Sequence, residues 1–193
     1  MAIVTLNNRA TNRSDTASAG QVFTATSSTA ADFQAVAPGG ITVADQWRLT
    51  TNFTGDANPL SSNLERIDTT GQGTIGSAMT VSSGIFTFPL TGIYLVKFTL
   101  QTYYNAANHY ATGLIYATTN NSSYAIVAAG DSGHASAGAN VYNLATRETL
   151  IDVTNTSNVK VKFVIDNQND STNVVGHTTY TYTNMMFIRL GDT

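Results

Sequence analysis

The residues able to carry acid–base or metal chemistry are few and widely spaced in this chain. Its only histidines are His109, His134 and His177, and none has a second histidine at a spacing suited to a shared metal ion. The segment Asp131-Ser-Gly-His134 places one carboxylate near one imidazole. A single such pair is more typical of a surface loop than of a metal site, so we predict no transition-metal centre.

The other patterns associated with catalysis are missing from the sequence. Glu65 and Glu148 are the only glutamates, and nothing pairs either with a second carboxylate for acid–base work. No Gly-x-Ser-x-Gly or P-loop pattern occurs. The spaced glycines of residues 71–76 precede no predicted helix that could hold a phosphate. We therefore expect no enzymatic activity, no catalytic residue and no organic cofactor.

One stretch of the sequence is a candidate calcium-binding site. Asp166-Asn-Gln-Asn-Asp170 offers the oxygen ligands that Ca²⁺ prefers, although it lacks the glycine and the terminal glutamate of an EF-hand loop. The alternative is a polar hairpin between a strand ending at Ile165 and one starting near His177.

The nine tyrosines allow two further interpretations. Tyrosine fills subunit interfaces, where its ring is buried and its hydroxyl finds a partner. An exposed tyrosine ring can instead stack on a sugar of a host glycan. Both stay open for the tyrosines of the central region, which are Tyr103, Tyr104, Tyr110, Tyr116, Tyr124 and Tyr142.

The elements that position these residues are predicted to be strands. Residues 84–98 contain two alternating runs around a turn at Pro89 to Gly92, with Phe86 and Phe88 sharing one face. After the turn, one face carries Tyr94, Val96, Phe98 and Leu100, and the opposite face carries Ile93, Leu95, Lys97 and Thr99. Because Ile93 and Leu95 are also apolar, we expect a strand that is partly covered on both faces.

The rest of residues 41–193 reads as short strands between Gly, Asn, Asp and Ser turns, without a helical period. Residues 159–165 alternate apolar residues with lysines, and Trp47 and Phe163 are core candidates. Residues 180–190 are apolar on both faces. This spacing is typical of an all-β sandwich or jelly roll.

A family resemblance follows from the first hairpin. The spacing of Phe86, Gly92, Tyr94 and Phe98 resembles the central signature of the C1q/TNF-like jelly-roll domains. The resemblance implies a two-sheet jelly roll that assembles as a homotrimer, with this segment and the C-terminal strand in the inner sheet. The fold-signature residues are Trp47, Phe86, Phe88, Pro89, Gly92, Tyr94, Phe98 and Phe163, and the candidate trimer-interface residues are Ile93, Leu95, Tyr180, Tyr182, Met185 and Phe187.

Residues 1–40 differ from the rest, because they are rich in Ala, Ser and Thr and end in the break Pro38-Gly39-Gly40. Their few apolar residues cannot form a core. We predict an extended anchoring arm, with a partly disordered tail as the alternative, followed by a trimerising jelly-roll domain over residues 41–193. The candidate anchor residues are Ile3, Val4, Leu6, Phe23 and Phe33.

Composition and charge limit the classes of partner that we expect for this chain. Charged residues make up 11% of the chain, the net charge is −3 and no basic run occurs, which argues against nucleic-acid binding. The chain has no cysteine, and we expect assembly in a reducing cytoplasm. Its N-terminus does not read as a signal peptide, and no apolar run is long enough for a membrane helix.

Two segments, Trp47-Arg-Leu-Thr and Gly84-Ile-Phe-Thr-Phe-Pro, also resemble those of C1q-like virion structural proteins of marine bacteriophages. That resemblance implies a virion-surface protein, most simply a capsid decoration or head-fibre protein, assembled in the host cytoplasm. Its partners would be two further copies of itself and the major capsid protein or another virion protein. The alternative is a fibre-tip module that recognises a host surface glycan, and a secreted bacterial adhesin is a third reading.

Overall fold

The computed structural model divides into two compact units, Met1–Gly40 and Ile41–Thr193. It describes residues 3–6, 9–12, 18, 20–28, 31–35 and 40–193, and of residues 3–12 it describes the backbone alone. All regular structure in the described part is β-strand, so the predicted all-β class is confirmed. No helix long and apolar enough to cross a bilayer occurs among these residues.

The N-terminal unit consists of two separate hairpins. Strands β1 (Ile3–Leu6) and β2 (Arg9–Asn12) pair with each other, and β3 (Gln21–Ala25) pairs with β4 (Ala31–Ala35). Each hairpin is a two-stranded sheet of its own. An isolated two-stranded hairpin is at best marginally stable in water. None of the side chains described in this unit is buried.

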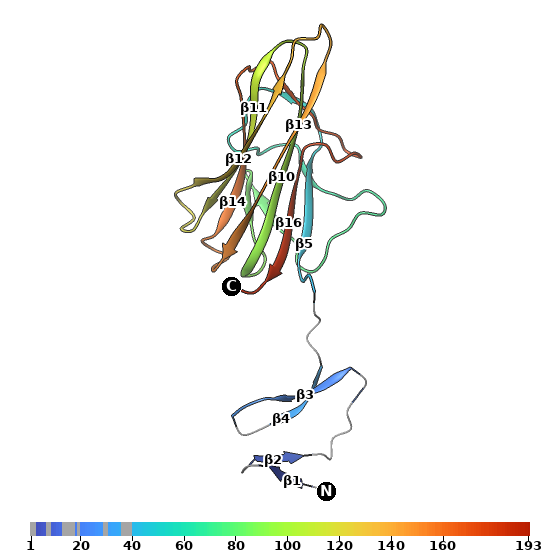
Figure 1. Cartoon of the computed structure of the whole chain (residues 1–193), viewed down its shortest axis with the longest axis vertical. Coiled ribbons are helices and arrows are strands. Elements are labelled where there is room, and N and C mark those ends of the chain that lie inside the picture. Colours follow the sequence, from blue (N-terminus) through green and yellow to red (C-terminus); the bar gives the residue numbers. More distant parts are fainter. Residues whose placement is uncertain (1–2, 7–8, 13–17, 19, 29–30, 36–39) are drawn as a thin grey trace. The chain divides into compact units, whose positions relative to one another are not determined.

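The second unit, the body, holds twelve strands in two antiparallel sheets (Figure 1). Sheet I contains β5 (Ala44–Leu49), β6 (Phe53–Thr54), β7 (Leu64–Arg66), β10 (Gly92–Tyr104), β13 (Val141–Val153), β15 (Asn173–Val174) and β16 (Asn184–Gly191). Sheet II contains β8 (Thr80–Ser82), β9 (Ile85–Thr87), β11 (Asn108–Thr118), β12 (Ala125–His134) and β14 (Lys160–Asn167).

Strand β10 lies at the centre of sheet I. It pairs with β13 along its whole length and, on its other edge, with β16 and then β15. Beyond β16 follow β5 and β7, which gives the order β13-β10-β16-β5-β7 across the sheet. In sheet II the order is β12-β11-β14-β9-β8.

The alternation predicted for β10 is present in the structure. Tyr94, Val96, Phe98 and Leu100 are fully buried, whereas Ile93, Leu95 and Lys97 on the opposite face are half-buried. The buried set faces sheet II, and the other set forms part of the outer face of sheet I. Gly92 starts the strand at a φ of 137°, where an L-residue is strained.

Aromatic rings fill the space between the sheets. Phe86 of β9 contacts Trp47, Phe163 and Phe187 with ring centroids 5.2 to 5.5 Å apart. Phe88 packs on Tyr94 at 4.7 Å. Of the fold-signature residues, the six aromatic side chains Trp47, Phe86, Phe88, Tyr94, Phe98 and Phe163 belong to one core cluster, and Pro89 and Gly92 form the turn that leads into β10.

Candidate subunit interface

The outer face of sheet I, which points away from the core, presents apolar side chains in cross-strand rows. In one row Leu150 of β13, Leu95 of β10 and Ile188 of β16 stand next to one another. Leu150 is 60% exposed on β13, the strand at one margin of the order β13-β10-β16-β5-β7. Contiguous apolar patches are typical of interaction surfaces, so this row is the candidate for one here.

A second apolar group lies on the same face at the other end of β13. The rings of Tyr142 and Tyr103 are opposite each other in register, with centroids 5.0 Å apart. Leu144, the next outward residue of β13, is 59% exposed, and Tyr142 is 56% exposed. These residues and the Leu150 row together make the outer face of sheet I apolar at two levels.

Polar residues separate the two apolar levels. Glu148 stands opposite Lys97, and Thr146 stands opposite Thr99, with their hydroxyl oxygens 3.4 Å apart. Opposite charges and paired hydroxyls in register stabilise neighbouring strands. Two apolar bands with a polar band between them form a surface whose register a partner would have to match.

The predicted interface residues separate into three groups. Ile93 and Leu95 lie on the outer face. Met185 and Phe187 have no exposed surface and belong to the core cluster of the single subunit, so their assignment to the interface is corrected. The reason is the alternation of side chains along β16, in which Met185 and Phe187 point into the core and Met186 and Ile188 point outward. Tyr180 and Tyr182 lie on the loop before β16, and whether they contact another subunit remains a prediction.

Sequence reasoning missed Leu144 and Leu150, and it left Tyr142 open between a subunit interface and a glycan contact. A usable signal was present, because outward positions of residues 142–152 are every second residue and include these three apolar side chains. Charged and hydroxyl residues at the remaining positions disguised the pattern, since Arg147 points inward and Thr149 is half-buried.

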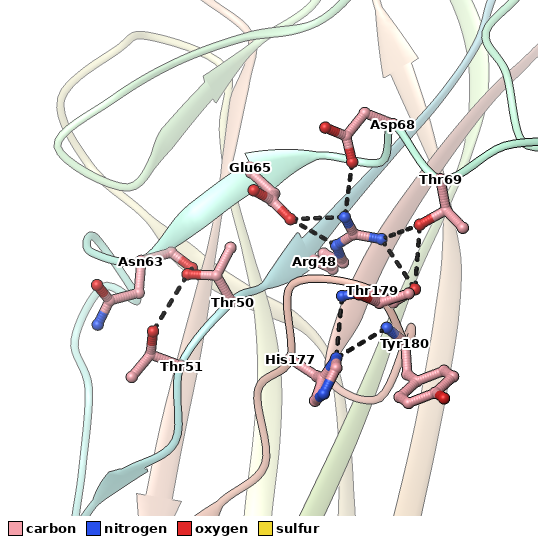
Figure 2. A network of polar contacts seen from close by, with 10 residues as sticks. All are labelled: Arg48, Thr50, Thr51, Asn63, Glu65, Asp68, Thr69, His177, Thr179 and Tyr180. Carbon is pink, nitrogen blue, oxygen red and sulfur yellow. Dashed lines mark hydrogen bonds and ion pairs between the residues drawn. The ribbon is translucent and has the colours of Figure 1, made fainter.

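The margin of sheet I formed by β5 and β7 carries a buried cation. Arg48 is 1% exposed and forms ion pairs with Glu65 and Asp68, each at 2.7 Å (Figure 2). Its Nη1 donates to Thr69 Oγ1 at 2.7 Å and to the carbonyl oxygen of Thr179 at 3.3 Å. This arginine therefore ties β5, the segment after β7 and the loop before β16 together.

A buried carboxylate acts in a similar way on the inner face of β5. Asp45, which has no exposed surface, accepts hydrogen bonds from Arg66 Nε at 3.0 Å and from Trp47 Nε1 at 3.1 Å. The backbone N–H of Met79 also donates to it, at 2.9 Å. Because a buried carboxylate without partners is very costly, these contacts identify Asp45 as a structural residue.

Between the sheets, β13 contributes a second buried cation. Arg147 Nη1 donates to the carbonyl oxygens of Gly113 and Gly130, at 2.5 and 2.7 Å. Its guanidinium lies 5.7 Å from the ring centre of Phe98. Burial lowers the pKa of Arg147 to about 10, and the charge of Asp131 opposes that lowering. The group stays charged at neutral pH and joins sheet I to two strands of sheet II.

The three histidines lie apart and have different surroundings. His134 is buried with Nε2 3.2 Å from Thr102 Oγ1, and burial lowers its pKa from 6.5. His109 is exposed, and His177 accepts backbone hydrogen bonds at Nδ1. Asp131 accepts a hydrogen bond from Thr112 at 2.6 Å. Within the described ranges no three His, Asp or Glu side chains gather into a possible metal site.

The Asp166–Asp170 stretch closes the end of β14. The backbone N–H of Asn167 donates to Asp56 Oδ1 at 2.7 Å, and its side-chain amide donates to the carbonyl oxygen of Gly55 at 2.8 Å. These bonds tie the stretch to residues 55 and 56, as expected for a polar turn. Calcium binding at this turn remains a prediction.

The structure describes the side chains of two of the five candidate anchor residues, Phe23 and Phe33. Phe23 and Phe33 face each other across the β3–β4 hairpin, with ring centroids 5.3 Å apart in an edge-to-face arrangement. Phe23 is 45% exposed and its neighbour Val22 is 48% exposed. Ile3, Val4 and Leu6 form β1, but their side chains lie outside the described residues.

No family model matches the sequence, and no curated protein sequence matches it. Solved structures do match. A structure of murine APRIL at pH 5.0 superimposes with a TM-score of 0.53 at 9% identity, over 77% of this chain and 98% of that chain. Eiger TNF from S. frugiperda superimposes with a TM-score of 0.56 at 12% identity, over 80% of this chain and 96% of that chain.

The chain has a TNF-like jelly-roll fold. This finding confirms the predicted C1q/TNF-like fold class. At 9 to 12% identity the likeness concerns the fold alone. In the TNF-like jelly roll of this chain, the strands with the apolar outer face are β13, β10 and β16, which form one half of sheet I.

Proposed function

We propose that this chain is a non-enzymatic structural protein that assembles as a homotrimer through the outer face of sheet I. The observation that carries the proposal is the exposed apolar row of Leu150, Leu95 and Ile188, with Tyr142 and Leu144 on the same face. Burying these side chains between subunits stabilises an assembly by about 25 cal/mol per Å² of apolar surface. The resemblance to C1q/TNF-like domains implies three copies.

We further propose that the trimer sits on the surface of a bacterial virus as a capsid decoration or head-fibre protein. The resemblance of the segments at Trp47 and at Gly84 to bacteriophage virion proteins supports this location. The cysteine-free, low-charge composition fits assembly in a host cytoplasm. A protein that caps neighbouring shell subunits stabilises the particle by mass action.

The arm is the proposed anchor on the major capsid protein or another virion protein. None of its described side chains is buried, and the Phe23–Phe33 pair leaves apolar surface exposed. Docking on an apolar site of the shell would bury these rings and order the hairpins at the same time. Three arms in one trimer would add avidity to a weak single contact.

The test uses particles that lack the protein, mixed with either the full chain or residues 41–193. Both proteins should form folded trimers, because the body contains the core and the proposed interface. Only the full chain should co-sediment with the particles. If residues 41–193 decorate the particles to full occupancy, the anchoring role of the arm is wrong.

A second role is favoured by the exposed ring of Tyr180, which is 58% accessible on a loop of the body. Such a ring suits a fibre-tip module that recognises a host surface glycan. The two roles can be distinguished by substitutions in different parts of the chain. Loss of the arm should abolish incorporation into particles, whereas changes on that loop should abolish adsorption to cells and leave incorporation intact.

A further inference from the structure

The loop between β15 and β16 presents three aromatic rings close together. His177 and Tyr180 stack with centroids 4.7 Å apart and planes 36° apart. Tyr182 lies 6.0 Å from Tyr180 and meets His177 edge-on at 6.2 Å. We call these three residues the ring cluster. Tyr180 is its most accessible member, at 58% exposure.

Hydrogen bonds hold the backbone under the ring cluster. His177 Nδ1 accepts from the backbone N–H of Thr179 at 2.9 Å and of Tyr180 at 3.2 Å (Figure 2). An accepting Nδ1 places the ring proton on Nε2. The carbonyl oxygen of Thr179 accepts from Arg48 and from Thr69 Oγ1, at 3.3 and 3.0 Å.

The start of the loop is fixed as well. The backbone N–H of Gly176 donates to Asn52 Oδ1 at 2.8 Å, and that of His177 donates to the carbonyl oxygen of Leu49 at 2.9 Å. A Cβ on Gly176 would lie within 2.7 Å of the backbone of Thr51, so the loop packs tightly against the end of β5. A ligand would therefore meet preorganised rings, which lowers the entropy cost of binding.

The charge around the ring cluster favours a neutral ligand. Residues 176–183 contain no Asp, Glu, Lys or Arg. The nearby guanidinium of Arg48 is buried and is paired with two carboxylates. Hydroxyl groups are abundant instead, since Thr178, Thr179 and Thr181 alternate with the rings. Aromatic faces beside uncharged hydrogen-bonding groups match a sugar ring, which has an apolar C–H face and a rim of hydroxyls.

The middle of the ring-cluster loop and the most exposed residues of the proposed interface lie at different margins of sheet I. The loop is bonded to Arg48 on β5, while Leu144 and Leu150 lie on β13 at the opposite margin of the order β13-β10-β16-β5-β7. The ends of the loop are nearer to that interface, since Val175 and Thr183 bond Gln101 of β10, which stands opposite Leu144. The mass of the Tyr180→Ala variant therefore tests whether Tyr180 contacts a second copy.

We propose that the ring cluster of His177, Tyr180 and Tyr182 is a binding site for a neutral pyranose, stacked on Tyr180 and hydrogen-bonded by its hydroxyls to the loop. The inference rests on the second, glycan-binding role and is independent of attachment to a shell. For one ring on an open surface the expected dissociation constant is on the order of 1–10 mM.

The experiment is saturation-transfer NMR on the full-length protein with methyl β-glucoside, methyl β-galactoside and methyl α-mannoside as probes. At least one probe should receive saturation, strongest on the C–H protons of one face. Tyr180→Phe keeps the stacking ring and should retain binding, whereas Tyr180→Ala should lower the affinity at least about tenfold. The matched control is Tyr110→Ala, which removes a 38% exposed tyrosine from β11 and should leave binding unchanged.

Three results would overturn the proposal. The first is an absence of saturation transfer to all three probes. The second is transfer that survives Tyr180→Ala, which would place the sugar elsewhere. The third is a change in the mass of the assembly on Tyr180→Ala, which would make Tyr180 a subunit contact. The first two outcomes do not bear on trimer formation or on binding to particles. The proposed structural function is therefore tested separately.

Discussion

At the scale of single residues, Arg147 shows how a buried charge can be accommodated. Its guanidinium reaches across the sandwich because Gly113 and Gly130 have no side chain on that side. A Cβ on Gly113 would contact Arg147 Nη1 and lie 2.9 Å from Phe98 Cε1. These two glycines are required by close packing, since neither has a positive φ.

Gly113→Ala is therefore expected to destabilise the body by about 1–3 kcal/mol, because Arg147 and Phe98 must both move in a filled core. The measurement is the free energy of unfolding from denaturant titration. Gly73→Ala is the matched control, since nothing lies within 4 Å of its added Cβ, and it should change stability by less than about 0.5 kcal/mol. Equal stabilities of the two variants would contradict the packing described for Arg147.

His134 makes stability depend on pH. Burial lowers its pKa below the ordinary 6.5, so the unfolded chain binds a proton at this position before the folded chain does. Stability is therefore full above about pH 6.5 and falls as pH decreases towards the lowered pKa, by up to about 1.4 kcal/mol per pH unit. Thermal melts at a series of pH values below about 6.5 measure this slope.

The control for this slope is a pair of histidine variants. His134→Gln keeps a group that can bond Thr102 Oγ1 and should flatten the dependence. His109→Gln changes an exposed histidine and should retain it. An unchanged slope in His134→Gln would show that other groups cause the dependence.

At the scale of elements, the proposed assembly depends most on the outward side chains of β13. Its outward positions expose Tyr142, Leu144 and Leu150, although the strand is paired with β10 along its whole length. Leu150→Asp should dissociate the assembly, because a carboxylate buried in an apolar contact costs roughly 3 kcal/mol or more without a partner. Sedimentation velocity reports the change in mass.

Ile126→Asp is the matched control for Leu150→Asp. Ile126 is 53% exposed on β12 of sheet II, so it tests a comparable apolar residue on the other sheet. It should leave the mass of the assembly unchanged. A stable assembly in Leu150→Asp, or dissociation in Ile126→Asp, would mean that the outer face of sheet I is not the interface.

The same elements show what sequence alone could predict. The period of two in residues 84–98 identified the faces of β9 and β10, because one face there is almost purely apolar. The final strand was harder, since Met185, Met186, Phe187 and Ile188 are all apolar and periodicity cannot tell which pair faces inward. The partner strand decides, because Met185 stands opposite Trp47 and shares its core face.

The networks around Arg48 and Asp45 could not be predicted, because their partners come from distant parts of the sequence. Thr179 lies 131 residues from Arg48 and Met79 lies 34 residues from Asp45. Sequence patterns record which residue faces a core, but not which loop folds over it. The ring cluster was missed for the same reason, since the loop that carries His177 is shaped by bonds to β5.

At the scale of the whole molecule, a body with its own core follows an arm in which no described side chain is buried. The body combines a TNF-like jelly roll with two apolar bands on the outer face of one sheet. The described part of the arm forms two hairpins, one of which carries the Phe23–Phe33 pair with Phe23 exposed. In the proposed function, the body carries self-association and the arm carries attachment.

The most direct test of the account is the mass of the purified full-length protein in solution, measured by light scattering after size exclusion. We predict three times the subunit mass of 20.4 kDa, independent of dilution over the micromolar range. A mass of 20.4 kDa, with the protein folded, would contradict assembly through the outer face of sheet I.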